Sequence, residues 1–258
     1  MQTNTLQISV IFDNVCGNQQ LASLWGFSCF IQTPKQNILF DTGSNGRLLL
    51  QNLAKKNLEL SKVNNIFISH AHWDHIGGID SVLELNPNVD IFVTSHLSKN
   101  LIRDLDTLSN GVTVINENLT EILPNIYSTG GMGDQSEQSL IIDTDEGLVI
   151  IAGCAHSGIE LIAKRAKEKL NKKILLLLGG FHLHNKEDNE VLKIINTIKQ
   201  LDTKYVCPSH CTGERATKLF KEAFKQYHID GGVGVEIGFD GSELLFKCNH
   251  STILGNFL

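Results

Sequence analysis

The sequence has no feature that would place the protein in a membrane or on nucleic acid. Apolar runs such as Ile174 to Leu178 are far shorter than the roughly 20 residues that a membrane helix needs. Lysine and arginine nowhere gather into a basic run, so there is no electrostatic footprint for nonspecific nucleic-acid binding, although RNA stays open as a substrate. Met1 to Asn4 are polar, and no basic segment precedes an apolar core, which argues against a secretory signal.

Cysteines are few and scattered, which favours a reduced protein. Six of them are spread over 258 residues, whereas disulfide-dense secreted domains are small. We therefore expect a cytoplasmic location. Hydrophobic residues make up 41% and charged residues 19% of the chain, so a substantial core is expected and disorder is not. The length fits one large α/β domain or two small ones.

One stretch concentrates chemistry: His70-Ala71-His72-Trp73-Asp74-His75. It follows Ile66 to Ser69, an apolar run that predicts a buried strand, and it precedes Ile79 to Leu85, which is expected to begin a helix. The stretch thus lies in a turn at the carboxyl end of a strand, where open α/β sheets usually place ligands. Four ligand-type residues within this turn would be costly to bury unpaired, so they predict a functional site.

The residue types predict a site for two metal ions. Histidine and aspartate together suit zinc, iron or manganese. His70 and His72 are two residues apart and can project to the same side of an extended turn, whereas Asp74 and His75 are adjacent and face differently. This division into two pairs predicts two metals in one pocket, which would bind a bridging hydroxide and clamp a substrate oxygen.

His-x-His-x-Asp-His after a strand resembles the signature of the metallo-β-lactamase superfamily. The resemblance extends over nearly the whole chain and implies a single domain over residues 1–258. The implied fold class is α/β: a four-layered αβ/βα sandwich, with two mixed β-sheets packed face to face and helices outside. It also implies a dinuclear site that holds two divalent ions, with zinc expected first and iron or manganese as alternatives.

Three later stretches narrow the resemblance to one branch of that superfamily. They are Gly153 to Gly158 (Gly-Cys-Ala-His-Ser-Gly), Gly179 to Leu183 (Gly-Gly-Phe-His-Leu) and Pro208 to Gly213 (Pro-Ser-His-Cys-Thr-Gly). They look like the branch that contains the archaeal dihydropterin-ribofuranosyl-aminobenzene 5'-phosphate synthases together with related metal-dependent hydrolases.

The resemblance also implies roles outside the motif, and the chain departs from it once before residue 140. An aspartate such as Asp41 lies under the metal pair in this superfamily and would hold a ligand histidine in one tautomer. Capping of the next helix by Asp41 or Ser44 is the alternative, and both roles can coexist. Residues Thr129 to Gln138 stand where the superfamily places a ligand histidine, but they contain none. Glu137 could replace it, although a loop glutamate is more often solvated.

A second departure lies at the Gly-Cys-Ala-His loop, where relatives carry an aspartate that bridges the metals. We expect His156 to be a ligand and Cys154 to be a small buried thiol, with a thiolate ligand as the alternative. His182 follows the strand expected at Lys173 to Leu178 and is either a substrate-facing acid/base, which we favour, or a further ligand. His96 either lines the pocket or lies on the surface.

His210 matches the last histidine of the superfamily. Cys207 and Cys211 flank it and could suggest a structural zinc site, but their spacing and the lack of a second cysteine pair favour His210 alone. One ion is expected at His70, His72 and His156, and the other at Asp74, His75 and His210; the assignment of His156 and His210 between the two ions stays open. Asp74 and His182 are the predicted catalytic residues.

Three functions compete on this basis. The first is a metal-dependent hydrolase that directs a metal-activated hydroxide at a small anionic substrate of the phosphorylated or ester type. The second is a synthase that joins a pterin methylene to an aminobenzene ribofuranosyl phosphate, with Trp25, Trp73 and Phe181 as candidate stacking residues. The third is a non-catalytic, metal-binding regulatory protein. The expected assembly is a monomer or a homodimer.

Periodicity predicts most of the remaining elements. Leu6 to Phe12 alternates like an edge or half-buried strand, and Arg47 to Leu60 has helical spacing with Leu50, Leu53, Ala54 and Leu58 inward. Further strands are expected at Gly26 to Gln32, Asn37 to Phe40, Val89 to Thr94, Gly111 to Ile115, Leu119 to Ser128, Ser139 to Asp143, Leu148 to Ala152, Lys204 to Cys207, Val233 to Ile237 and Glu243 to Lys247. Further helices are expected at Ile159 to Leu170, Asn189 to Leu201 and Glu214 to Tyr227.

Overall fold

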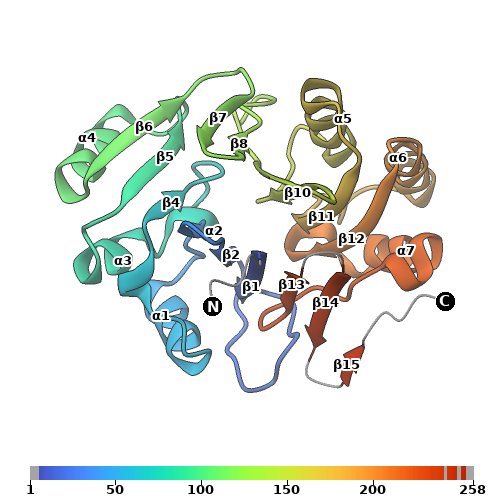
Figure 1. Ribbon diagram of the computed structural model, residues 1–258, viewed down its shortest axis with the longest axis horizontal. Coiled ribbons are helices and arrows are strands. Elements are labelled where there is room, and N and C mark those ends of the chain that lie inside the picture. Colours follow the sequence, from blue (N-terminus) through green and yellow to red (C-terminus); the bar gives the residue numbers. More distant parts are fainter. Residues whose placement is uncertain (1–5, 241–242, 249–250, 254–258) are drawn as a thin grey trace. The chain divides into compact units, whose positions relative to one another are not determined.

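The chain divides into two compact units in a computed structural model that describes residues 6–240, 243–248 and 251–253. Unit 1 comprises Met1–Val93, Leu97–Thr113 and Gly232–Leu258, and unit 2 comprises Thr94–His96 and Val114–Gly231. Figure 1 labels the elements of both units along the chain. The expectation of a single domain over residues 1–258 stays a prediction.

Unit 1 is built on a mixed sheet of nine strands in the part of the chain that the structure describes. The strand order is β15-β14-β13-β1-β2-β3-β4-β5-β6, with β3, β4 and β5 parallel to one another. The strands are β1 (Leu6–Asp13), β2 (Phe27–Gln32), β3 (Asn37–Phe40), β4 (Asn65–Phe67), β5 (Asp90–Thr94), β6 (Gly111–Ile115), β13 (Glu236–Asp240), β14 (Glu243–Cys248) and β15 (Ser251–Ile253). The helices are α1 (Gly46–Lys55), α2 (Trp73–Ile76), α3 (Ile79–Leu85) and α4 (Lys99–Leu108), with a 3-10 turn at Leu60–Lys62.

The prediction that Leu6 to Phe12 is an edge or half-buried strand is wrong. Strand β1 pairs with β2 on one side and with β13 on the other, both antiparallel, and all but one of its residues are buried. The sequence pattern of a strand reports its side chains, whereas its place in the sheet depends on β13, which returns from more than 200 residues later.

The inward face of α1 also differs from the prediction. The helix buries Gly46, Leu49, Asn52 and Leu53, whereas Ala54 is exposed. Asn52 is inward because its amide group has three backbone partners: it donates to the carbonyls of Ile11 and Ala22 and accepts from the amide of Ala22. Leu53 is buried and Leu50 and Leu58 pack against the core, as predicted. Apolar spacing alone is wrong about Ala54 and misses Asn52, because a buried polar group that is fully hydrogen-bonded costs little.

Unit 2 is built on a mixed sheet of six described strands in the order β12-β11-β10-β9-β8-β7, with β10, β11 and β12 parallel. The strands are β7 (Thr120–Leu123), β8 (Ile126–Ser128), β9 (Leu140–Thr144), β10 (Gly147–Ala152), β11 (Ile174–Gly180) and β12 (Thr203–Ser209). The helices are α5 (Ile159–Leu170), α6 (Asp188–Gln200) and α7 (Glu214–Phe224), with 3-10 turns at His210–Thr212 and Lys225–Tyr227. Figure 1 shows the three helices along the outer side of β10 to β12.

Each unit has an apolar core of its own. In unit 1 the core joins residues of β1, β3, β4 and β5 to α1, α3 and α4, and in unit 2 it joins β10 and β11 to α5, α6 and α7. Among the described residues, no helix combines the length and the apolar character needed to cross a membrane. Two mixed sheets with helices confirm the predicted α/β class.

Candidate metal centre

Unit 1 carries the first candidate ligands directly after β4. The histidine–aspartate cluster, which we define as His70, His72, Asp74 and His75, occupies the turn between β4 and α3, and α2 begins inside it. His70, Asp74 and His75 are at most 6% exposed, and His72 is half-buried. The short helix α2 was not predicted, because a single turn carries no apolar period. It orients Asp74 and His75 so that Asp74 Oδ2 lies 3.7 Å from His75 Nε2.

Asp41 orients two histidines of this cluster, His75 directly and His70 through Ser69. Its fully buried carboxylate accepts hydrogen bonds from the amide and the hydroxyl of Ser69, each at 2.7 Å, and lies 2.7 Å from His75 Nδ1. Because the Ser69 hydroxyl hydrogen points at Asp41, its oxygen can accept from His70 Nδ1 at 2.9 Å. Both histidines are thereby held with hydrogen on Nδ1 and a lone pair on Nε2, the nitrogen left for a metal.

These residues fit a divalent metal ion. His70 Nε2 and His72 Nδ1 lie 3.0 Å apart, close to the roughly 3.3 Å that Zn–N bonds of about 2.0–2.1 Å give at tetrahedral angles. Neither Asp41 nor Ser44 caps α1. The N-cap is Asn45, whose side chain accepts a hydrogen bond from the amide of Leu48. The Asp41 contacts are those that the predicted orienting role requires.

Unit 2 gathers candidate ligands at the ends of three adjacent strands. The thiol–imidazole cluster, which we define as Cys154, His156, His182, His210 and Cys211, follows the carboxyl ends of β10, β11 and β12. Ligand atoms of Cys154, His156 and His182 lie within 4.8 Å of one another, and so do those of Cys154, His210 and Cys211. Parallel strands that neighbour one another end at one edge, which is why residues some 28 positions apart meet.

The backbone is strained at four residues that follow strand ends in the two units. Asp41, Ala155, His182 and His210 have φ between 50° and 59°, a left-handed conformation that costs non-glycine residues energy and clusters at functional sites. Gly179 allows the close approach that β11 needs, since a Cβ there would lie 2.0 Å from the carbonyl oxygen of Ala152.

His182 and Cys211 shift each other's protonation. The hydrogen bond to Cys211 raises the pKa of His182, against a smaller opposite effect of burial. Burial by itself raises the pKa of the Cys211 thiol, but hydrogen bonds with Cys154 and His182 and the nearby His210 hold that pKa well below its usual value. The two shifts have opposite directions, as expected for a thiol and an imidazole that share a hydrogen bond.

Glu137 is not the solvated loop residue that the sequence favours. Its side chain is 1% exposed, and its two carboxylate oxygens accept from the amides of Cys154, Ala155 and His156, each at 2.8 Å, and pair with His156 Nδ1 at 2.7 Å. Loop composition does not reveal this burial, because only the tertiary structure brings three amides to this carboxylate.

The other predicted residues divide into buried and exposed. Cys154, Cys207 and Cys211 are buried, and the five cysteines whose side chains the structure describes form no disulfide. Phe181 is fully buried against Phe220, with ring centroids 5.4 Å apart, so it is not a stacking residue for substrate. Trp25 and Trp73 are 44% and 62% exposed and remain candidates, and His96 is exposed.

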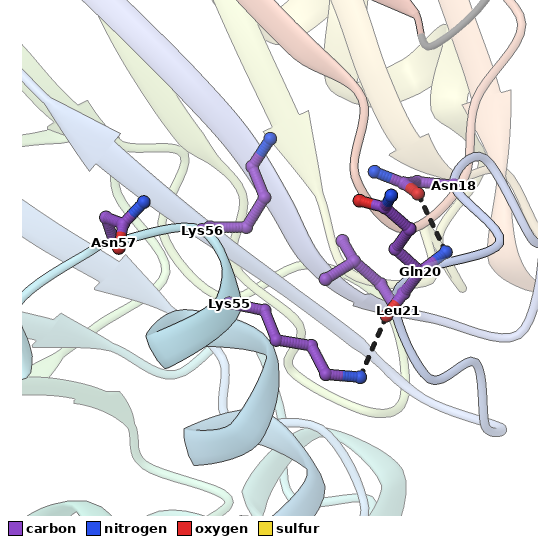
Figure 2. A pocket seen from close by; sticks show the side chains of 6 residues that line it. All are labelled: Asn18, Gln20, Leu21, Lys55, Lys56 and Asn57. Carbon is purple, nitrogen blue, oxygen red and sulfur yellow. Dashed lines mark hydrogen bonds between the residues drawn. The ribbon is translucent and has the colours of Figure 1, made fainter.

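A separate polar cavity in unit 1 contains none of the predicted ligands. Its lining, drawn in Figure 2, consists of Asn18, Gln20, Leu21, Lys55, Lys56 and Asn57. Lys55 donates to the carbonyl of Gln20, and Lys56 pairs with Glu236. Both lysine charges are thus already engaged by the protein, and the cavity has no part in the candidate metal centre.

The sequence model of the metallo-β-lactamase superfamily matches residues 26–210. The chain belongs to the metallo-β-lactamase superfamily. The predicted family and its α/β fold are therefore confirmed, and membership implies metal binding, with the histidine–aspartate cluster as a set of suitable residues. Most members of this superfamily are enzymes.

Two relatives and one solved structure are similar to this superfamily member over most of its length. The 7,8-dihydropterin-6-methyl-4-(β-D-ribofuranosyl)-aminobenzene-5'-phosphate synthase of Methanocaldococcus jannaschii is 26% identical over 87% of this chain and 94% of its own. An uncharacterized protein of the same archaeon is 30% identical over 90% of this chain and 99% of its own. A solved metal-dependent hydrolase of the β-lactamase superfamily has a TM-score of 0.78 at 28% identity, covering 92% of this chain and 100% of its own.

Proposed function

We propose that this superfamily member is a metal-dependent hydrolase of a small anionic substrate that carries a phosphoester, ester or lactone group. The observation that carries the proposal is the histidine–aspartate cluster, in which Asp41 fixes the tautomers of His70 and His75. Fixed imidazoles cost little reorganisation when they bind a metal, which is how such ligands are prepared in metalloenzymes.

The proposal includes two divalent metal ions, with zinc as the preferred metal. Their proposed ligands are His70, His72, Asp74, His75, His156 and His210. When bound, such ions would act as Lewis acids and lower the pKa of coordinated water to about 7. The choice of zinc follows from the nitrogen-rich donor set and from the thiols of Cys154 and Cys211 near His210.

His182 is proposed as the proton donor to the leaving group. The hydrogen bond to Cys211 raises the pKa of His182, which is the direction that a general acid requires. The half-buried ring of His156 lies against it, with centroids 4.5 Å apart, so His182 is close to a proposed ligand. Asp74 combines the roles of ligand and catalytic carboxylate in this proposal.

A synthase activity is the second candidate, and a different observation favours it. The named relative with 26% identity forms a dihydropterin–aminobenzene ribofuranosyl phosphate and aligns over nearly its whole length. The two tryptophans of unit 1 are exposed, so they could stack on flat rings of such a substrate. Fold alone does not decide between the reactions, since one scaffold hosts many chemistries.

The metal content of the purified protein tests the proposal. We expect about two zinc ions per chain by elemental analysis, a clear loss in His156→Ala, and an unchanged content in His182→Ala, with turnover reduced by about 10²–10⁴-fold. His96→Ala, which removes an exposed histidine outside both clusters, serves as the matched control.

The substrate class is then read from two assays on the metal-loaded protein. Hydrolysis of nitrophenyl phosphoesters or lactones would support the hydrolase, and condensation of a pterin pyrophosphate with an aminobenzene ribofuranosyl phosphate would support the synthase. A wild-type protein that takes up no metal would overturn both. Metal uptake without turnover in either assay would favour a regulatory metal-binding protein.

A further inference from the structure

We infer that Glu137 is a positioning residue that holds His156 in the tautomer needed to bind a metal. The inference deepens the proposed function and rests on it where metal affinity is concerned. It concerns the very stretch in which the superfamily's usual ligand histidine is missing, between Thr129 and Gln138.

Hydrogen bonds other than those to His156 hold the loop that carries Glu137. Its backbone amide and carbonyl pair with those of Met132, at 3.0 and 2.8 Å, and close the loop between them. The next residue, Gln138, is anchored by a hydrogen bond from the hydroxyl of Ser128 at 2.7 Å. The carboxylate is therefore presented by a rigid loop, and its side chain is 1% exposed.

The Glu137 carboxylate faces a concave set of backbone amide donors. Three successive amides, those of Cys154, Ala155 and His156, point at the Glu137 carboxylate at 2.8 Å each. The left-handed conformation of Ala155, with φ 59°, produces this concavity, which is the known geometry of anion-binding backbone nests. The Glu137 carboxylate is thus the anion that this nest binds. Glu137 therefore acts as a hydrogen-bond acceptor rather than as a metal ligand.

The fourth donor, the imidazole of His156, connects Glu137 to the proposed metal site. His156 Nδ1 lies 2.7 Å from Glu137 Oε2, and an ionised carboxylate can only accept, so the hydrogen lies on Nδ1. The lone pair is then on Nε2, the nitrogen that points away from Glu137. The same 2.7 Å contact joins Asp41 Oδ2 to His75 Nδ1 in unit 1, so each unit pairs one buried carboxylate with one proposed ligand.

The tautomer can be read directly in the metal-free protein. We expect ¹⁵N NMR at a pH where histidine is neutral to show His156 protonated on Nδ1, with His156→Ala identifying the signals. In Glu137→Gln the single amide oxygen cannot serve all four donors, so the Nδ1-protonated population should fall. An unchanged tautomer in this variant would overturn the inference, whatever the metal content of the protein.

Metal affinity gives a second readout, by competition with a chromophoric zinc chelator. We expect Glu137→Gln to bind zinc about 10–100-fold more weakly than wild type, as for other residues that orient a ligand. In a His156→Ala background the same substitution should have no further effect. A loss that persists in that background would mean that Glu137 only supports the loop, which would also overturn the inference.

Gln135→Ala is the matched control, because it shortens an exposed side chain of the same loop and leaves the hydrogen bonds of Glu137, Gln138 and His156 in place. Its zinc affinity should stay near that of wild type. An equal loss in both variants would assign the effect to general loop damage. A wild-type chain that binds no zinc would refute the proposed function, whereas the tautomer measurement would still decide the role of Glu137.

Discussion

At the scale of single residues, buried polar groups matter more than apolar ones for this site. Asp41 is fully buried, yet each of its oxygens has at least one donor. A buried carboxylate without such donors would be strongly destabilising. The hydrogen bonds to Ser69 and His75 therefore do two things at once: they satisfy the charge, and they set the direction in which the imidazoles offer their lone pairs.

His228 is a buried histidine that is not in either cluster. Its imidazole side chain is fully covered, with Asp230 at 3.6 Å from Nδ1. Burial lowers its pKa below the ordinary value near 6.5, which Asp230 partly offsets and Lys221 reinforces. The folded protein therefore binds this proton more weakly than the unfolded chain does.

The consequence is a loss of stability in acid. As pH falls through about 6.5, the ordinary histidine value, the unfolded chain takes up the proton first, so the free energy of unfolding decreases until the folded-state pKa is also passed. Urea unfolding of the metal-free protein between pH 8 and pH 5 should show a smaller decrease for His228→Gln than for wild type. The difference between the two proteins at pH 8 provides the baseline, and parallel curves would contradict the prediction.

At the scale of elements, one irregularity in a strand ties a helix to the sheet. The pairing of β1 with β2 shifts register between Val10 and Phe12, as a bulge does. The carbonyl of Ile11 at this point accepts from the Asn52 side chain of α1 at 2.9 Å. The same amide group also holds Ala22, so Asn52 connects α1, β1 and the loop that leads to β2.

Removing this side chain should be costly. Asn52→Ala leaves the carbonyls of Ile11 and Ala22 and the amide of Ala22 without their partner, and each unsatisfied buried group costs about 1–3 kcal/mol. We expect the free energy of unfolding to fall by about 2–4 kcal/mol in denaturant titrations. Gln51→Ala, at the exposed neighbouring position, should change it by less than about 0.5 kcal/mol. Equal effects of the two substitutions would disprove the structural role of Asn52.

At the scale of the whole molecule, the two units obtain their candidate ligands in different ways. Unit 1 takes its four from one turn of six residues after β4. Unit 2 needs its sheet order β12-β11-β10 to bring three distant segments to one edge. Metal binding would therefore report on the folded chain, because the unfolded chain keeps only the first set close together.

Zinc should stabilise the folded protein in proportion to its affinity. At free zinc about 100-fold above the dissociation constant, the free energy of unfolding should rise by roughly 2.7 kcal/mol. Thermal denaturation should then shift by roughly 5 °C or more between the zinc-loaded and the chelator-treated protein. The double variant His70→Ala/His72→Ala should lose most of the shift. A wild-type melting temperature that does not depend on zinc would contradict a folded-state metal site.

Local sequence was sufficient for features that depend on neighbours along the chain. The stretch from His70 to His75 predicts its own chemistry, because ligand types at that spacing after a strand have few other uses, and the superfamily it indicates is confirmed. The helix Ile79–Leu85 and the paired strands Asn37–Phe40 and Phe27–Gln32 follow from apolar periodicity and turn residues, and the structure contains them.

Only the tertiary structure decided which polar groups are buried and with whom. Glu137 reads as a solvated loop residue until the fold brings three amides of the Cys154 to His156 loop to it. The apolar spacing of its helix gives no sign that Asn52 is buried, and its partner is a carbonyl at the bulge of β1. The reason is physical: apolar burial follows a period along the chain, whereas the burial of a polar group depends on partners that are distant in sequence and absent from any local pattern.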